Sequence, residues 1–214
     1  MKAIPREAGR ITYSTEIRKL KQIAFDEYQK AVIIGCVLGD GYLEENWSKT
    51  NYRLNLCHSI KQKEYVMWKA NILQKWIISK PYLHKSTKSL RIRTVSHEWL
   101  TFIQKIFYEN KLKRIPENIE DFLLNPITLA VWFMDDGNVR KYKGSVNSFD
   151  LNTQSFTLEE NERLIDALKK VYGLKTTINL NNGYHRIHVL SADRFRFRNI
   201  IESFIIESIR YKLG

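Results

Sequence analysis

The sequence is poor in cysteine and in long apolar runs. It has two cysteines in 214 residues, Cys36 in a helical pattern and Cys57 in a strand pattern. Two are too few for a disulfide framework or a cysteine metal knuckle, so both are predicted to be ordinary buried thiols. The longest apolar run, 31–39, is far shorter than the roughly 20 residues of a membrane-spanning helix. The first ten residues have no apolar signal core. We therefore expect an intracellular, soluble protein of the cytoplasm, nucleoid or organelle matrix, neither secreted nor bound to a membrane.

Acidic residues are also scarce. Asp and Glu number 23 against 35 Lys and Arg, which gives a net charge of +12. This excess favours a polyanionic partner such as nucleic acid. The phosphate-cradling pattern GxxxxGK[ST] is absent, and the histidines lack the partnered arrangement of a His-metal nuclease. With 43% hydrophobic residues, the chain can bury the core of one large domain or two small ones.

Two patterns occur twice in the chain. "IIGCVLGDG" (33–41) and "LAVWFMDDG" (129–137) are apolar runs that end in Asp and Gly, at Asp40 and Asp136. "RIRTVSHEWLTF" (91–102) and "RIHVLSADRFRF" (186–197) share Arg-Ile, a β-type pair, Ser, and Phe six residues after that Ser. The two patterns recur at nearly the same spacing. They therefore predict two structurally similar halves.

Each half is predicted to contain helices and strands in an αββαββα-like order, which gives an α+β fold. Asp26 is expected to cap the first motif helix, and Asn125 followed by Pro126 the second. Ser96 and Ser191 are expected to cap the helices that follow strands. Strands are predicted over 52–58, 90–95, 149–154, 176–180 and 185–190, and helices over 62–76 and 157–173. The predicted parts are an N-terminal extension (1–25), a first half (26–110), a connector (111–125) and a second half (126–214).

Alternation along the strands assigns the side chains to two faces. The predicted core face holds Leu54, Leu56, Leu90, Ile92, Leu151, Ile178, Leu180, Ile187 and Val189. The other face holds Arg, Asn, Gln and His, the side chains that read base edges, with Asp150 as its one acid. The predicted DNA-reading residues are Arg53, Asn55, Arg91, Arg93, Asn152, Gln154, Asn179, Arg186 and His188, and phosphate contacts near the hairpin tips are predicted for Lys85, Lys88, Arg140, Lys141 and Lys143.

The repeated acids suggest a chemistry. An Asp-Gly pair alone is most often a turn, and an apolar stripe is most often core. A pseudo-two-fold arrangement, however, would bring Asp40 and Asp136 close together. Adjacent carboxylates near phosphates repel both each other and DNA, and a divalent metal resolves that repulsion. Metal-assisted phosphodiester hydrolysis needs such carboxylates.

With these motifs the sequence resembles the single-chain, two-motif LAGLIDADG homing endonucleases of the intron-encoded type. The resemblance runs from about residue 30 onward and includes "LGDGY", "RIPEN", "WFMDDG", "LNTQSFT" and "YKL". It implies two motif helices packed at the centre, each followed by an antiparallel sheet, with the sheets forming a saddle over DNA. It also implies a monomer that makes a double-strand break in a long asymmetric target.

The family's site residues transfer by motif position. The resemblance implies that Asp40 and Asp136 are the catalytic acids and metal ligands, and that Lys113 and Lys212 are the basic catalytic residues. The preceding positions, Gly39 and Asp135, complete the predicted metal site. Asp135 is not the matching ligand and is expected to support the site. Mg²⁺ is the expected cofactor, with Mn²⁺ or Ca²⁺ as substitutes.

The sequence departs from the family pattern where the motif helices meet. Gly35 is the small residue expected there, but Val131 takes the matching place in the second copy, which predicts asymmetric helix packing. Two other functions remain open on the same fold: an RNA maturase that assists intron splicing, with intron RNA as partner, and a DNA-binding regulator that does not cleave. The segment "STEIRKLKQIAF" (14–25) is expected either to dock on the body as a short helix or to contact DNA.

Overall fold

The computed structural model describes residues 15–181 and 183–214. These residues group by their internal contacts into two compact units. The first unit comprises 15–29 and 42–104, and the second comprises 30–41 and 105–214. Both Asp-Gly motifs, 33–41 and 129–137, therefore belong to the same compact unit, although they come from different halves of the sequence.

The first unit is built on a four-stranded antiparallel sheet in the order β1-β2-β4-β3. The core face of this sheet packs against α4, and Leu54, Leu56, Leu90 and Ile92 are buried there, as predicted. Its elements are α2 (Thr15–Leu20), β1 (Tyr42–Glu45), β2 (Tyr52–Ser59), η2 (Ile60–Gln62), α4 (Lys63–Ile72), η3 (Gln74–Trp76), β3 (Tyr82–His84), β4 (Ser89–Arg93) and the start of α5 (Glu98–Phe107).

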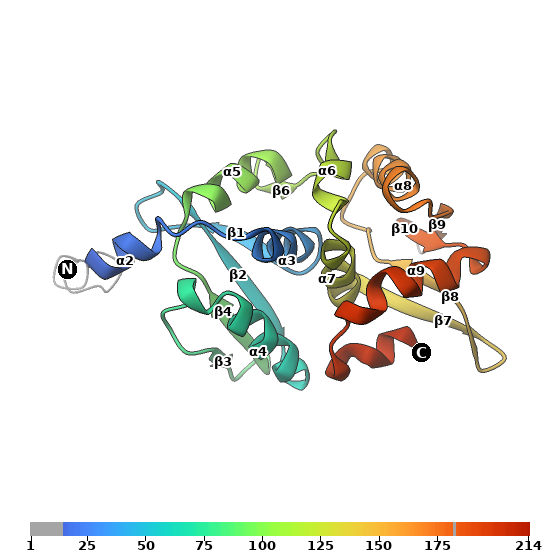
Figure 1. Ribbon diagram of the computed structural model, residues 1–214, viewed down its shortest axis with the longest axis horizontal. Helices are drawn as coiled ribbons and strands as arrows, with labels where there is room; N and C mark the ends of the chain where they lie inside the picture. The colour runs from blue at the N-terminus through green and yellow to red at the C-terminus, as the bar shows by residue number, and fades with distance from the viewer. Residues whose placement is uncertain (1–14, 182) are drawn as a thin grey trace. The chain divides into compact units, whose positions relative to one another are not determined.

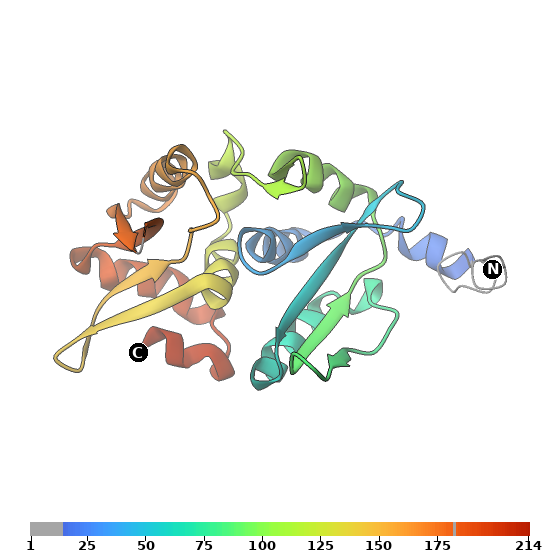
Figure 2. The same cartoon turned by 180° about the vertical axis from the view of Figure 1, so that it is seen from behind.

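The second unit repeats this order around a sheet β7-β8-β10-β9. Helix α8 packs against β9 and β10, and α9 packs against α7 and β8. Figure 2 shows the β7–β8 hairpin in yellow. The elements are most of α3 (Glu27–Leu38), β5 (Tyr108–Glu109), β6 (Leu112–Lys113), α6 (Ile119–Leu123), α7 (Pro126–Asp136), β7 (Gly137–Tyr142), β8 (Ser145–Leu151), α8 (Leu158–Tyr172), β9 (Thr176–Asn181), β10 (Tyr184–Val189), η4 (Ser191–Asp193), α9 (Arg194–Ile201), η5 (Glu202–Phe204) and η6 (Glu207–Leu213).

Both motif helices begin where the sequence predicts. Asp26 Oδ1 accepts the backbone N–H of Gln29 at 2.8 Å, and Gln29 Oε1 accepts that of Asp26 at 3.0 Å. This reciprocal pair satisfies two N–H groups at the start of α3. At the start of α7, Asn125 Oδ1 accepts the N–H of Ile127 at 3.2 Å, and Pro126 occupies the first helical position.

Two predicted serine caps are wrong. Helix α5 begins at Glu98, and the ring nitrogen Nδ1 of His97 accepts the N–H of Trp99 at 3.0 Å. The Ser96 hydroxyl instead accepts a hydrogen bond from Asn46. Ser191 opens the short 3₁₀ turn η4, and α9 starts only at Arg194. In both cases the strand-to-helix connection is longer than the repeated pattern suggests.

Three residues are more exposed than the sequence predicts. Cys57 is exposed, whereas Cys36 is buried as expected. Residue 57 shares the face of β2 that carries Arg53 and Asn55, so the pleat turns its thiol outward. Leu180 is 69% exposed because β9 is an edge strand and this residue lies close to its end. Ile178 on the same strand is only partly buried.

Among the described residues, no helix combines the length and the apolar character that crossing a membrane requires.

Candidate active site and nucleic-acid interface

The two motif helices contact each other closely at Gly35. A Cβ atom on Gly35 would lie 2.6 Å from the Cβ of Val131 and 2.7 Å from the carbonyl oxygen of Thr128. The Thr128 hydroxyl also donates to the carbonyl of Ala31 at 3.2 Å. Figure 1 shows α3 and α7 side by side. The absent side chain on α3 thus makes room for the valine on α7, which explains how the helices pack with unequal residues at matching positions.

The C-terminal ends of these helices meet at the repeated acids. A Cβ on Gly39 would lie 2.5 Å from the Cβ of Asp135 and 2.7 Å from its Oδ2 atom. That same Oδ2 accepts the backbone N–H of Asp40 at 3.2 Å. Carboxylate oxygens of Asp40 and Asp135 lie within 4.8 Å of each other. Position 39 of the first motif corresponds to Asp135 of the second motif. Because Gly39 has no side chain, it leaves room for the Asp135 carboxylate.

Each motif end receives a lysine. Lys113 in β6 donates from Nζ to the carbonyl of Gly39 at 2.5 Å. Lys212 in η6 donates to the carbonyls of Met134 and Asp135 at 2.7 and 2.8 Å. The carbonyl groups at a helix C-terminus carry partial negative charge, which the acids in the last turn increase. The two lysines offset that charge and explain why carboxylates are tolerated there.

Burial gives one acid and one lysine of this site unusual proton affinities. It raises the pKa of Asp136 to about 7, with further contributions from the nearby charges of Asp40 and Asp135. The ammonium groups of Lys113 and Lys212 oppose this rise in pKa. Burial also lowers the pKa of Lys113, against the pull of the three carboxylates. The Asp136 pKa remains high although two lysines are near, so its negative charge is incompletely compensated.

On the first sheet, a glutamate holds the predicted DNA-reading residues. Glu44 Oε2 accepts from Arg53 Nε at 3.2 Å and from Asn55 Nδ2 at 3.3 Å, and it lies 4.0 Å from Arg93 Nη1. The prediction that Asp150 is the one acid among the polar side chains is therefore wrong. Glu44 is absent from the predicted face because none of the predicted strands covers the residues directly after the first motif. Alternation through Tyr42–Glu45 would have revealed it.

On the second sheet, three of the side chains predicted to contact DNA surround one buried aspartate. Asp150 is fully buried. Its Oδ2 accepts from Arg140 Nε at 2.6 Å and from Arg186 Nη1 at 3.4 Å, and its Oδ1 lies 2.7 Å from His188 Nδ1. These contacts fix the directions of the two guanidinium groups. A reading face whose side chains are already oriented loses less conformational entropy on binding.

The remaining predicted contacts divide into three groups. Asn179 lies in β9 of the same sheet, where it is the register partner of Arg186 in β10. A strand is expected over 149–154, but β8 ends at Leu151, so Asn152 and Gln154 lie beyond the strand. The backbone N–H of Asn152 donates to the Asp136 carbonyl at 3.0 Å, which places this residue beside the motif end. Exposed cations at the turns and on the strands are Lys85, Lys88, Arg91, Arg93, Lys141 and Lys143.

Two helices that end in matched acids, each followed by a sheet with a cationic face, define the architecture of a two-motif DNA endonuclease. Residues 30–197 match the LAGLIDADG DNA endonuclease family, and the chain belongs to that family. The predicted fold class and the predicted enzyme class, a homing endonuclease that hydrolyses DNA, are thereby confirmed.

Relatives and solved structures agree with this assignment. The chain is 31% identical over 207 residues to a probable intron-encoded endonuclease 1 of Wickerhamomyces canadensis, covering 91% of this chain and 87% of that protein. It is 26% identical to the cytochrome b mRNA maturase bI2 of Debaryomyces hansenii, covering 88% and 74%. The homing endonuclease I-WcaI, solved bound to its DNA recognition sequence, superposes with a TM-score of 0.86 at 26% identity, covering 98% and 96%. I-DmoI, solved with DNA and Mn, shares the fold at 18% identity, with a TM-score of 0.53 and coverage of 84% and 98%.

Proposed function

We propose that this protein is a site-specific homing endonuclease that cuts both strands of a long, asymmetric DNA target by divalent-metal-dependent hydrolysis. One observation carries the proposal: the two motif helices contact each other, and each ends in an acid beside a lysine that binds its terminal carbonyls. A single chain that carries both motif ends can address both strands without a partner subunit. We therefore propose that the protein acts as a monomer on double-stranded DNA.

The donor set at the motif ends fits a divalent cation. Asp40, Asp135 and Asp136 supply carboxylate oxygens, which Mg²⁺ prefers as ligands. The raised pKa of Asp136 marks a carboxylate whose charge the two lysines do not fully balance, and a cation would supply that balance. In this proposal Asp40 and Asp136 hold Mg²⁺, with Asp135 beside them. Mn²⁺ and Ca²⁺ are candidate substitutes, in line with the I-DmoI structures solved with Mn and with Ca. When bound, the ion would lower the pKa of an attacking water and offset charge on the leaving oxygen.

The two lysines have roles of their own. Each uses part of its ammonium group to hold the end of a motif helix, and its other N–H bonds can donate to a phosphate oxygen or to water. Donors fixed before the reaction stabilise charge that develops on the phosphate without a reorganisation cost. Because burial lowers the pKa of Lys113, its ammonium gives up a proton more readily than an exposed lysine does. That property suits proton transfer to or from water.

The polar sheet faces supply target binding. The fixed guanidinium groups of Arg53, Arg140 and Arg186 can make bidentate contacts to guanine in a major groove. Asn55 and Asn179 can pair with adenine in the same way. The exposed lysines at the hairpin turns, Lys85, Lys88 and Lys143, are placed for contacts to phosphate, which set register and not sequence. Each sheet would thus read its own part of the target.

The test is end-mapping sequencing of a plasmid library of genomic fragments after incubation with the protein in Mg²⁺ or in EDTA. We expect defined ends that require Mg²⁺ and that disappear with Asp40→Asn and with Asp136→Asn, while DNA binding persists. Asp166→Asn, an exposed aspartate on α8, is the matched control and should cleave as the wild type does. Mg²⁺-dependent ends that survive in Asp40→Asn or Asp136→Asn would overturn the assignment of the acids.

Assistance of RNA splicing is a second candidate function, because the maturase of Debaryomyces hansenii matches 88% of this chain. A maturase role predicts that a structured intron RNA competes with duplex DNA for the protein. Competition binding separates the possibilities. If an intron RNA displaces the duplex while an unrelated RNA of equal length does not, the maturase role gains support, and equal displacement by both argues against it.

A further inference from the structure

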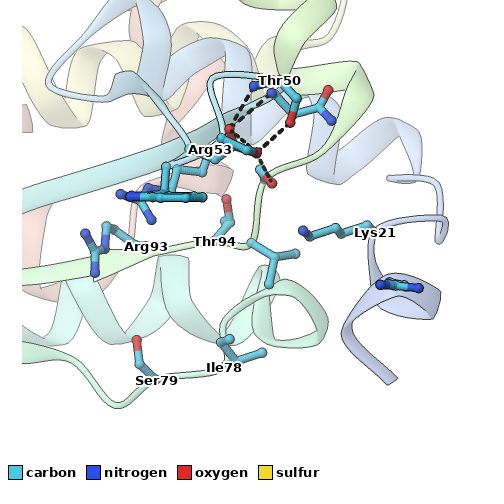
Figure 3. Close-up of a pocket in the computed structure, with 14 residues that line it drawn as sticks. Lys21, Thr50, Arg53, Ile78, Ser79, Arg93 and Thr94 are labelled. Atoms are coloured by element: carbon cyan, nitrogen blue, oxygen red, sulfur yellow. Dashed lines mark hydrogen bonds between the residues drawn. The ribbon is translucent and has the colours of Figure 1, made fainter. Parts of the chain in front are cut away.

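A pocket of about 680 Å³ lies in the first unit, between the N-terminal helix α2 and the end of the sheet (Figure 3). Its walls come from α2 and the residue that follows it, from the β1–β2 turn, and from β2 and β4 with the residues after β4. Four of the residues that line it are cationic, and none of the described lining residues is acidic. The cationic lining residues are Arg18, Lys21, Arg53 and Arg93.

The segment that carries Arg18 and Lys21 is anchored. Ile17 and Phe25 are 4% and 3% exposed, and the ring of Phe25 lies 4.3 Å from that of Trp76. Between them, the carbonyl of Ile23 accepts from Trp76 Nε1 at 3.2 Å and lies 3.1 Å from the His97 ring nitrogen Nε2. The short helix therefore docks on the body of the protein, which is one of the two expectations for this segment. Its apolar side chains fix the backbone, and Arg18 and Lys21 line the pocket.

The opposite wall is fixed by Asn46. Its side-chain oxygen accepts from the Thr50 N–H at 3.0 Å and from the Ser48 hydroxyl at 3.2 Å. Its amide nitrogen donates to the Thr50 and Ser96 hydroxyls at 3.1 and 3.3 Å. One asparagine therefore ties the β1–β2 turn to the residues after β4. The hydroxyl and amide groups of this wall are held in place before any ligand arrives.

The cations of the pocket lie close enough to disturb each other. Burial and the charge of Arg18 lower the pKa of Lys21. Burial and the charge of Arg53 lower the pKa of Arg93, and Glu44 only partly opposes this. Figure 3 shows Lys21 extending toward the end of β4, where Arg93 lies and Thr94 follows. Clustered like charges are unfavourable until an anion enters, and guanidinium, ammonium and hydroxyl donors together match the oxygens of a phosphate.

We propose that this pocket is a phosphate site that binds a backbone phosphodiester of DNA beside the stretch contacted by the first sheet. The inference rests on the proposed function and adds a contact that the sheets alone do not provide. DNA is favoured over a free anion because Arg53 and Arg93 belong both to the pocket and to the polar face of the first sheet. A duplex on that face would therefore bring its backbone to the pocket. Helix α2 would extend the footprint of the protein on one side of its target.

The test compares two lysines on the same segment. Lys21 lines the pocket, whereas Lys19 is exposed on α2 and does not line it. Binding of the full-length protein to a duplex of mixed sequence is measured by fluorescence anisotropy over a range of salt concentrations. For Lys21→Gln we expect weaker binding, with the slope of log affinity against log salt reduced by about 1. Lys19→Gln should retain the slope of the wild type. Arg18→Gln, at an exposed lining residue, should behave like Lys21→Gln and keeps the test valid if Lys21→Gln fails to fold.

The outcomes separate the pocket from the catalytic proposal. Equal slopes for Lys21→Gln, Arg18→Gln and Lys19→Gln, with a wild type that binds and cuts DNA, would overturn the phosphate site alone. A reduced slope for Lys21→Gln in a protein that never cuts would support the site and remove the endonuclease proposal. Inorganic phosphate is titrated in parallel. If phosphate binding depends on Lys21 while the DNA slopes are unchanged, the pocket takes a free anion and its assignment to DNA is wrong.

Discussion

The two halves of the chain repeat the same elements but hold their carboxylates differently. In the first half, Asp40 is exposed, and the side chain of Glu44 is 35% exposed. In the second half, Asp150 is fully buried and Asp135 is 9% exposed, and burial raises the pKa of Asp136. The matched acids Asp40 and Asp136 therefore lie in different dielectric surroundings. A sequence repeat fixes where an acid lies, whereas burial decides how strongly its charge interacts.

The largest difference between the halves should appear when the two sheet acids are neutralised. Asp150→Asn leaves Arg140 and Arg186 without their buried carboxylate and should reduce the free energy of unfolding by about 3 kcal/mol. Glu44→Gln removes a partly exposed partner of Arg53 and Arg93 and should cost less than about 1 kcal/mol. Chemical denaturation of both variants measures the difference. Equal losses would show that the two sheets hold their cations in the same way.

A smaller effect is expected at the contact between the motif ends. Gly39→Ala places a methyl group 2.5 Å from the Cβ of Asp135, so the end of one helix must shift. Overpacking of this kind should cost about 2 kcal/mol of stability. Because Asp40 directly follows Gly39, cleavage should fall as well.

The matched control is a double-mutant cycle with Asp135→Ala. Alanine keeps the Cβ but removes the carboxylate that a new methyl group at position 39 would meet at 2.7 Å. Stability lost in Gly39→Ala should therefore be partly recovered in the double variant, which gives a favourable interaction energy. If the two substitutions add without interaction, the approach of position 39 to the Asp135 carboxylate does not limit stability, and the strain lies at the Cβ that alanine keeps.

Much of the site could be predicted because the repeat marks its positions. The two acids follow from "LGDG" and "WFMDDG", and the caps at Asp26 and Asn125 are local hydrogen-bonding patterns that any helix start needs. The lysines needed the family resemblance. Lys113 and Lys212 lie far along the chain from the helix ends whose carbonyls they bind, and no local pattern in the sequence encodes that contact.

The errors have a common physical cause. Alternation of side chains does not show where a strand ends or where other elements stop covering the face of a sheet. Leu180 follows the core periodicity but lies on an edge strand. Asn152 and Gln154 continue the period of β8 after the strand has ended. Burial of Asp150 among three basic side chains depends on pairing between β7, β8 and β10, and this pairing becomes visible only in the folded chain.

A dependence of stability on pH separates Asp136 from its exposed counterpart Asp40. The folded-state pKa of Asp136, about 7, lies above the ordinary value of 3.8. The unfolded chain therefore releases this proton at lower pH than the folded protein does, and stability falls as pH rises from about 4 through 7. In metal-free protein, a pKa raised from 3.8 to about 7 corresponds to a loss on the order of 4 kcal/mol over this range. Asp136→Asn should lack it, so its stability relative to the wild type should increase across this range, as measured by thermal unfolding in EDTA. Asp166→Asn, at an exposed aspartate on α8, is the matched control and should keep the pH dependence of the wild type. Asp40→Asn removes a charge that raises the Asp136 pKa and should weaken that dependence. Mg²⁺ should flatten the wild-type curve above pH 7, since a bound cation favours the ionised carboxylate. Parallel curves for the wild type and Asp136→Asn would mean that the burial of Asp136 has no energetic consequence.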